Sequence, residues 1–141
     1  MASKMKAIVM DGFGSPDVLH LGTVERPAPN DAQVLIQVVA TSVNRPDIVQ
    51  REGNYPPPPG ESDVLGLEIA GTVIELGKDV TDWHRGDRGV ALVGGGGYAQ
   101  FAIAYADHLI RIPESMSFQE AACICETYIT CLLYTSDAAD E

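Results

Sequence analysis

The feature that most constrains the fold of this chain is a series of short apolar stretches separated by glycine and proline. The clearest is residues 33–40 (QVLIQVVA), whose β-branched side chains favour an extended strand. Residues 6–10, 18–26 and 66–76 have the same character, and 18–26 alternates apolar with polar residues as a half-buried strand does. These spacings predict antiparallel strands that meander through one small domain. They do not fit the long crossovers that parallel strands require.

Further strands are expected at residues 90–93, 98–104 and 108–112. Gly71 lies in the middle of the 66–76 stretch, where a barrel strand is expected to bend or bulge. Four glycines at 94–97 could cradle a phosphate only if a helix followed them, and no helical pattern does. We therefore expect a flexible hairpin loop there. Ser117 and Glu120 have the spacing of a capping box and predict a short helix through residues 121–123.

The composition excludes several classes of protein. A net charge of −11 over 141 residues is unsuited to nucleic acid or to an anionic membrane surface. No apolar run approaches the length of about 20 residues that a membrane helix needs, and residues 1–6 lack the apolar region of a signal peptide. The three cysteines have no spacing typical of zinc or disulfide frameworks. We expect a cytoplasmic protein in a reducing compartment, with no nucleic-acid or membrane partner.

Residues 44–60 (NRPDIVQREGNYPPPPG) have the composition expected of one wall of a small-molecule site. Asn44 is suited to cap a helix, and Asp47 stands where the second member of a capping box would stand. The helix has room for about two turns before Gly53. The alternative is that Asn44 and Asp47 are a cap and nothing more.

Tyr55 is followed by four prolines, which favour a stiff polyproline II segment and push Tyr55 into an extended conformation. The phenol is then held on a rigid support with little entropy to lose on binding. The alternative is a surface tyrosine without a role.

The last eleven residues, 131–141 (CLLYTSDAADE), continue none of these patterns. One reverse translation of them resembles the mosaic end of a transposase sequencing adapter read in frame. We expect a natural domain over residues 1–130 and a non-native tail over 131–141.

From Met5 to Thr130 the chain resembles the N-terminal, GroES-like domain of medium-chain dehydrogenases/reductases. Within them it is most similar to the zinc-free quinone oxidoreductases. The motifs that carry the resemblance are SVNRPDIVQREGNYPPPPG, VLGLEIAGTVIELG, RGDRGVAL, GGYAQF and AACICETYIT, in this order. The resemblance implies a mainly β fold with short helices, a partly open GroES-like β-barrel. It also implies a Rossmann domain that is missing from this sequence.

Both zinc sites of the related alcohol dehydrogenases depart from their pattern here. Asn44 stands where those enzymes carry a cysteine, and Leu67 stands where they carry the histidine of a Gly-His-Glu motif. Leucine cannot ligate zinc, and an asparagine amide is a poor substitute for a thiolate. The four-cysteine lobe that holds structural zinc is also missing. The resemblance therefore implies an enzyme without zinc.

Carried over by position, Asn44, Tyr55 and Thr130 match residues that line the nicotinamide and substrate cleft. Asn44 and Tyr55 are the expected catalytic residues, with Tyr55 as a proton donor, and Asn44 and Thr130 are the expected cofactor contacts. Asp47, Val49 and Glu68 are expected to line or support the cleft. Val49 replaces a tyrosine of some bacterial relatives, and we expect Glu68 to pair with a buried basic group.

The resemblance implies that the full-length enzyme is an NADPH-dependent homodimer that transfers hydride to a quinone or another α,β-unsaturated carbonyl. The 141-residue fragment should be inactive, because the phosphate-binding loop belongs to the missing domain. One alternative is an enoyl thioester reductase of the same superfamily. The other comes from a different class, a GroES-like oligomeric module without enzymatic activity.

Overall fold

The computed structural model of the protein describes residues 3–137. The strands are β1 (Lys4–Met10), β2 (Leu19–Glu25), β3 (Gln33–Thr41), β4 (Glu68–Leu76), β5 (Arg88–Leu92), β6 (Phe101–Tyr105) and β7 (Ile110–Arg111). The helices are α1 (Arg45–Arg51), α2 (Phe118–Ala121) and α3 (Ile129–Asp137), with 3-10 turns η1 (Pro16–Val18) and η2 (Ala106–His108) and a π-helical turn η3 (Ile124–Tyr128).

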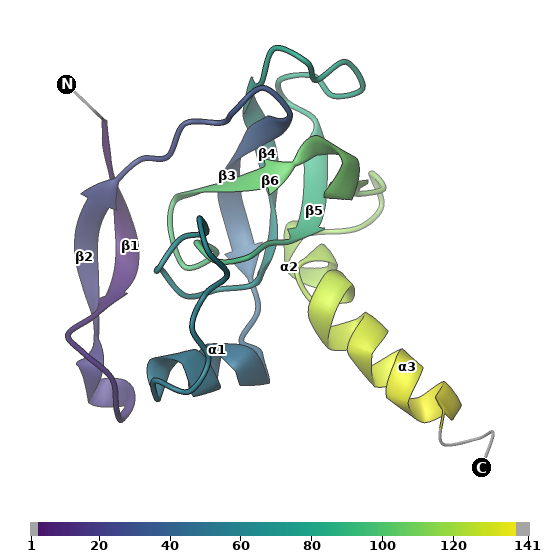
Figure 1. Ribbon diagram of the computed structural model, residues 1–141. Coiled ribbons are helices and arrows are strands. Elements are labelled where there is room, and N and C mark those ends of the chain that lie inside the picture. Colours follow the sequence, from purple (N-terminus) through teal and green to yellow (C-terminus); the bar gives the residue numbers. More distant parts are fainter. Residues whose placement is uncertain (1–2, 138–141) are drawn as a thin grey trace.

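The strands form two antiparallel sheets, as the spacing of the apolar stretches predicts. Five strands pair in the order β6-β3-β4-β5-β7, and β1 pairs with β2 as a separate ribbon beside them (Figure 1). The two sheets are connected rather than closed. Ile8 N–H donates to the Tyr98 carbonyl at 2.8 Å, and Gln100 N–H donates to the Lys6 carbonyl at 3.0 Å. The predicted partly open, GroES-like β fold is confirmed.

The bend or bulge expected at Gly71 in β4 lies instead in its partner strand β3. The pairing of β3 with β4 shifts between Val38 and Ala40, so that Val39 is the extra residue of a bulge. Gly71 pairs with Val38 beside this shift. A Cβ atom on Gly71 would lie 2.1 Å from the Gln37 carbonyl oxygen, so only glycine allows the two backbones to approach this closely.

The five-stranded sheet carries apolar residues on both faces. Along β4, Ile69 and Val73 face one core, and Ala70 faces the other, as the period of two requires. The first core contains Val34, Ile36, Ile69, Val73, Trp83, Ala91, Val93, Ala102, Ala104 and Leu109. The second core lies under α2, whose Ala121 packs with Val90 and Ile112. Burial on both faces explains why β4 reads as a nearly continuous apolar stretch.

Three of the predicted elements differ in detail. The start of the 18–26 stretch is taken up by η1, and 108–112 is divided between η2 and the two-residue strand β7. The helix capped by Ser117 and Glu120 forms as predicted, as α2, but it ends at Ala121 and does not reach Cys123.

The expectation of a flexible hairpin loop at the glycine run is wrong. Gly95, Gly96 and Gly97 are buried, and their backbones lie against residues 62–66. Gly96 N–H donates to the Val64 carbonyl at 2.7 Å, and Gly97 N–H donates to the Gly66 carbonyl at 2.9 Å. The glycines serve close backbone packing, which a pattern read along the chain does not indicate.

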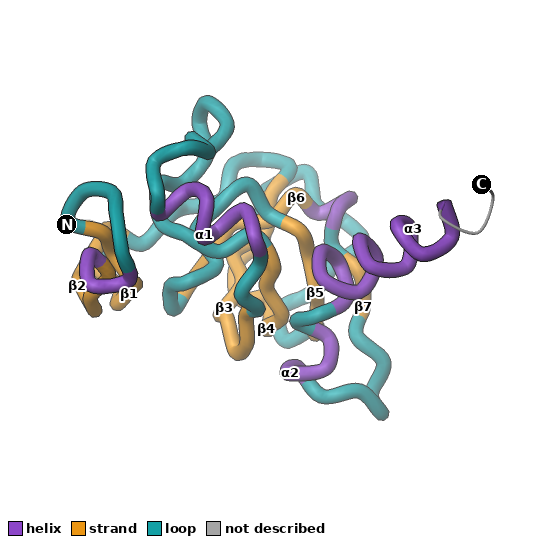
Figure 2. Tube along the Cα trace, turned by 90° about the horizontal axis from the view of Figure 1, so that it is seen from below, coloured by secondary structure: helices purple, strands orange, loops and turns teal. Residues whose placement is uncertain are grey.

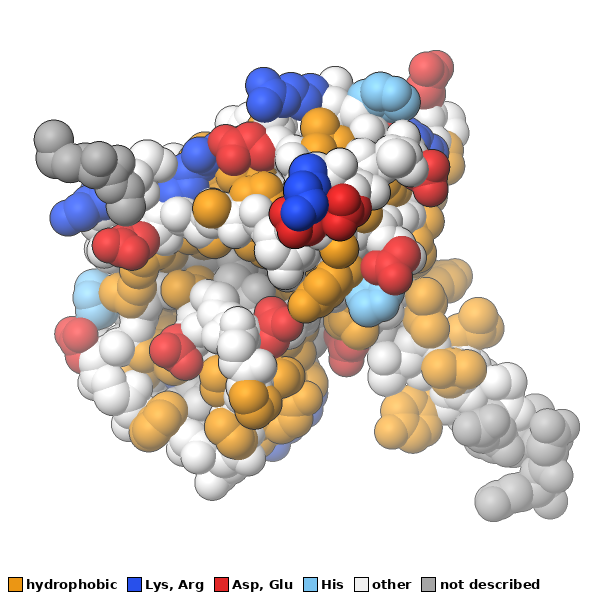
Figure 3. Space-filling model, turned by 45° about the horizontal axis from the view of Figure 1, so that its top comes forward, with side chains coloured by type: hydrophobic (Ala, Val, Ile, Leu, Met, Phe, Trp, Pro, Cys, Tyr) orange, Lys and Arg blue, Asp and Glu red, His pale blue; other side chains and the backbone are white. Residues whose placement is uncertain are grey.

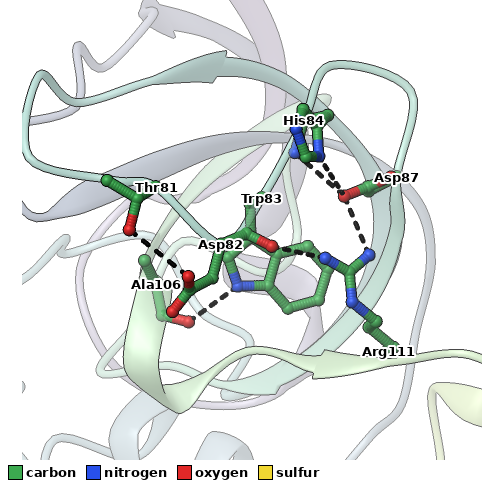
Figure 4. Close-up of polar contacts among 7 residues, drawn as sticks. All are labelled: Thr81, Asp82, Trp83, His84, Asp87, Ala106 and Arg111. Atoms are coloured by element: carbon green, nitrogen blue, oxygen red, sulfur yellow. Dashed lines mark hydrogen bonds and ion pairs between the residues drawn. The ribbon is translucent and has the colours of Figure 1, made fainter.

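A cluster around Trp83 fastens the 82–87 turn to β7 (Figure 4). The Arg111 guanidinium stacks 4.3 Å from the centroid of the Trp83 ring and forms an ion pair with Asp87 at 2.8 Å. The indole N–H of Trp83 donates to the Ala106 carbonyl at 3.0 Å. The hydrogen bond from Arg111, with a second from the His84 backbone, lowers the pKa of Asp87. This cluster is a structural clamp at the end of the sheet.

Helix α2 covers the second core and contacts β3 and β4, whereas α1 and α3 lie to the sides of the sheet. Figure 2 shows α1 on one side and α3 projecting from the other, and Figure 3 shows apolar side chains exposed along that projection. Within residues 3–137 no helix combines the length and the apolar character needed to cross a membrane.

Candidate functional site

Helix α1 begins at Asn44, as its sequence predicts. The backbone N–H of Asn44 donates to Asp47 Oδ2 at 2.8 Å, which is the Asp47 half of the capping box. The Asn44 side-chain oxygen faces the first turn of α1, but the hydrogen bond that it accepts comes from the Thr127 hydroxyl, at 2.9 Å. Asn44 therefore has a second role beside the helix cap.

Asp47 is a buried carboxylate that joins three segments. Besides the Asn44 N–H, it accepts the Gly66 N–H at 3.1 Å and the Tyr98 hydroxyl at 3.0 Å. Burial raises the pKa of Tyr98 above its ordinary value, and the charge and hydrogen bond of Asp47 raise it further. The Tyr98 hydroxyl is thus held protonated, and Asp47 holds α1 against Gly66 and against the turn that follows the glycine run.

Glu68 is fully buried, and the expectation of a basic partner for it is wrong. No Lys, Arg or His among residues 3–137 forms an ion pair with it. Neutral donors surround the carboxylate instead. Ser42 Oγ lies 2.5 Å from Oε2, and the Glu126 N–H donates to Oε1 at 3.0 Å. Backbone N–H groups at the start of η3 replace the predicted cation.

Thr127 completes the polar cluster and is the residue that sequence reasoning missed. Its hydroxyl lies 2.9 Å from Asn44 Oδ1 and 3.3 Å from Glu68 Oε2. The predicted cofactor contact, Thr130, lies three residues later in α3, where it is half-buried. Thr127 belongs to the same AACICETYIT motif, and its spacing from Thr130 places the two about one helical turn apart.

Two further side chains respond to the Glu68 charge. Burial raises the pKa of Glu126, and the charges of Glu68 and Asp47 raise it further. Burial also raises the pKa of the Cys125 thiol, with Glu68 as the second cause. Both groups are therefore biased toward their neutral forms beside the cluster.

Tyr55 lies apart from this cluster. It follows α1, whereas Asn44 precedes it, and a seven-residue helix is about 10 Å long. Tyr55 is 44% exposed and lines a separate cavity of about 280 Å³ with Phe13, Gln50 and Pro56. Val49 lies half-buried on α1 between the two ends.

Only some of the named residues fit a nicotinamide. Thr130 is partly exposed and Tyr55 offers its hydroxyl, whereas the Asn44 amide is buried and bonded to Ser42 and Thr127. Dinucleotide phosphates are typically held by a glycine-rich turn that leads into a helix. The glycine run 94–97 leads into β6, so these residues do not fit the phosphate groups.

Neither a metal centre nor the larger cavity of the domain involves the predicted site residues within residues 3–137. Within residues 3–137 no three His, Cys, Asp or Glu side chains gather as a metal site would need. A larger cavity of about 670 Å³ lies between β2, residues 59–64 and β6. None of the predicted site residues lines it, so we place the candidate site at α1 and η3.

Comparison with known proteins agrees with this architecture. Residues 30–114 match the model of the alcohol dehydrogenase GroES-like domain. The chain is 39% identical to a quinone oxidoreductase of Lama guanicoe over 129 residues, which covers 89% of the chain and 39% of that protein. It is 35% identical to a synaptic vesicle membrane protein VAT-1 homolog-like of Mus musculus, covering 92% of the chain and 31% of that protein.

A solved structure agrees as well. The quinone oxidoreductase from Coxiella burnetii superposes with a TM-score of 0.88 at 33% identity, covering 97% of the chain and 46% of that structure. The chain thus spans between about a third and half of the length of the proteins it matches. It belongs to the alcohol dehydrogenase GroES-like domain family, with relatives among the quinone oxidoreductases and the VAT-1 homologues.

Proposed function

We propose that this chain is the catalytic-domain part of an NADPH-dependent reductase that acts on quinones and other α,β-unsaturated carbonyls. Two quinone oxidoreductases among the relatives support this substrate class. The observation that carries the proposal is Tyr55, a partly exposed phenol on a rigid proline-bounded segment at the edge of a cavity.

In this proposal Tyr55 is the proton donor of the reaction. A bound NADPH would supply the hydride, and addition of that hydride would leave an enolate or a hydroquinone anion on the substrate. Tyr55 donates its proton to that anion and is reprotonated from water. A phenol performs this step only within hydrogen-bond reach of the forming anion.

The remaining residues support the cleft in this proposal. Thr130 contacts the nicotinamide and Val49 contributes an apolar contact. Asn44, whose amide is bonded to Ser42 and Thr127, supports the wall from behind together with Asp47 and Glu68. Asp47 and Glu68 have their carboxylate oxygens bonded within the protein, which suits support rather than proton transfer.

The test is a full-length parent carrying Tyr55→Phe. Loss of a general acid lowers turnover by about a hundredfold or more, and we expect NADPH affinity to stay nearly unchanged. The matched control is Tyr105→Phe, an exposed tyrosine on β6. Oxidation of NADPH is followed with a quinone and with a crotonyl thioester. Unchanged turnover in Tyr55→Phe would contradict the catalytic role, and a preference for the thioester would identify an enoyl thioester reductase.

The 141-residue chain itself should be inactive and bind NADPH weakly, and the parent should be a cytoplasmic homodimer. Micromolar NADPH affinity of this chain in calorimetry would contradict the first expectation. Ring-sized oligomers of this chain in light scattering would favour the non-enzymatic GroES-like module instead.

A further inference from the structure

The β1–β2 ribbon separates from the five-stranded sheet along β6 (Figure 1). Gln100 N–H still donates to the Lys6 carbonyl at 3.0 Å, but the Lys6 N–H donates to the side-chain oxygen of Gln100 at 2.8 Å. Beyond Gln100 no hydrogen bond joins the ribbon to β6 within residues 3–137. The space that opens between β2, residues 59–64 and β6 is the cavity of about 670 Å³, here called the wedge.

Strand β6 presents a free backbone edge to the wedge. It is the last strand of the sheet and pairs only with β3. The Ala106 N–H donates to the Ala32 carbonyl in the register of that pairing, so the even-numbered residues of β6 direct their backbone groups to β3. The odd-numbered residues Phe101, Ile103 and Tyr105 direct theirs to the free edge, where none of the described strands lies.

The same three residues supply an apolar wall. Side chains alternate along a strand, so those of Phe101, Ile103 and Tyr105 share one face of β6, and all three line the wedge. The Arg26 guanidinium lies 4.9 Å from the centroid of the Phe101 ring and covers it from one side. Free backbone groups beside apolar side chains are what an extended peptide uses when it adds a strand to a sheet.

The opposite side of the wedge is acidic. Glu25, Glu61 and Asp63 line it as exposed residues, and none of them forms an ion pair with another described residue. Among the described residues that line the wedge there is no Lys, Arg or His. Arg26, beside the wedge, is already paired with Glu75 at 2.6 Å. A partner that matches this charge pattern is basic.

We propose that the wedge is a docking surface for an extended basic peptide segment of a partner protein. The segment adds a strand to the free edge of β6 and places lysine or arginine side chains against Glu25, Glu61 and Asp63. The wedge has the size of a ligand cleft, which is typically about 300–1,000 Å³. A second copy of this chain is a poor occupant, because it carries a net charge of −11 and would set like charges against each other.

The test measures binding of a probe peptide to the 141-residue chain and is independent of the proposed reductase function. The probe is a fluorescein-labelled peptide of about six residues that alternates lysine with valine, and fluorescence anisotropy gives its Kd. We expect a peptide that alternates glutamate with valine to bind about tenfold more weakly or less. The lysine peptide N-methylated at every residue cannot donate hydrogen bonds and should lose about tenfold as well.

Amide hydrogen exchange locates the bound peptide. Binding should slow the exchange of the Phe101, Ile103 and Tyr105 amides, whereas the Ala102 and Ala104 amides face β3 and are the internal controls. Equal affinities for the lysine and glutamate peptides, or protection confined to other parts of the chain, would overturn the proposal. A dimer that protects the same amides without peptide would assign the edge to a second copy and would overturn it too.

Glu25→Gln/Glu61→Gln removes two of the carboxylates and should weaken binding of the lysine peptide about tenfold. Asp63 is left in place because it also lines the cavity of the proposed substrate. Asp17→Asn/Glu114→Gln, at exposed positions outside the wedge, is the matched control with the same net charge and should keep the wild-type Kd. Should the first variant fail to fold, the three peptides on the wild type decide alone. Equal losses for the two variants would mean that overall charge binds the peptide, against the proposal.

Discussion

The Thr127 hydroxyl donates a hydrogen bond of 2.9 Å to the side-chain oxygen of Asn44, joining the π-helical turn η3 to the residue that caps α1. Glu68 lies behind both, and its carboxylate accepts the Ser42 hydroxyl and the Glu126 N–H. The segment that leads out of the sheet is therefore anchored on a buried negative charge. The first prediction concerns that anchor.

Glu68→Gln should destabilise the domain by about 2–3 kcal/mol, because an amide offers N–H groups to neighbours that are themselves donors. The measurement is urea unfolding at neutral pH. Glu75→Gln is the matched control. Its ion pair with Arg26, 2.6 Å long, is partly exposed, and such a pair contributes less than about 1 kcal/mol. Equal losses for the two variants would show that the Glu68 network does not anchor η3.

Tyr98→Phe should show a crossing dependence on pH. At neutral pH the variant loses the hydrogen bond to Asp47 and about 1 kcal/mol of stability. The pKa of Tyr98 is raised in the folded state, so its contribution is present below the ordinary value of 10.0 and is lost as pH rises beyond it. The wild type should thus lose its advantage over Tyr98→Phe above about pH 10.

Urea unfolding at neutral pH and above pH 10 measures this difference. Tyr105→Phe, on the exposed edge strand β6, is the control and should keep a constant offset from the wild type. A constant offset for Tyr98→Phe as well would mean that neither burial nor the Asp47 carboxylate opposes ionisation of Tyr98.

Glu126→Gln should stabilise the domain at neutral pH. The pKa of Glu126 is raised by burial and by Glu68 and Asp47, so its contribution to stability is present below 4.5 and is lost as pH rises. Replacing the ionised side chain removes that cost, by less than about 1 kcal/mol because the group is partly exposed. The gain should shrink as pH falls toward 4.5. Glu114→Gln, an exposed control, should show no such trend in thermal unfolding between pH 4 and 7.

Much of the fold follows from local sequence patterns. The β-branched stretch 33–40 forms β3. Ser117 and Glu120 form the capping box of α2 that their spacing predicts. The glycine run 94–97 did not follow from local patterns, because its role is set by backbone atoms of residues 62–66 that only tertiary structure brings near. Glycine suits both a mobile loop and close packing, and the sequence alone does not distinguish them.

The contacts of the candidate site are also hard to predict from sequence, because tertiary structure brings their residues together. Asn44 Nδ2 donates directly to Glu68 Oε2 at 3.4 Å, and both residues contact Thr127, which lies 83 residues after Asn44 in the sequence. A buried carboxylate suggests a cation, and backbone N–H groups of η3 satisfy it without one. Tyr55 was grouped with Asn44 because they are close in sequence. The intervening helix α1 separates them in space.

The last prediction concerns the tail. We propose that residues 131–141 are not native to this domain, and Leu132, Leu133 and Tyr134 are 61%, 58% and 76% exposed. Deleting 131–141 should change the free energy of unfolding by no more than about 0.5 kcal/mol. Deleting 124–141 also removes Glu126 and Thr127 from Glu68 and should cost several times more. Chemical denaturation of the two truncated chains distinguishes the cases, and a large loss from the shorter deletion would show that the tail belongs to the fold.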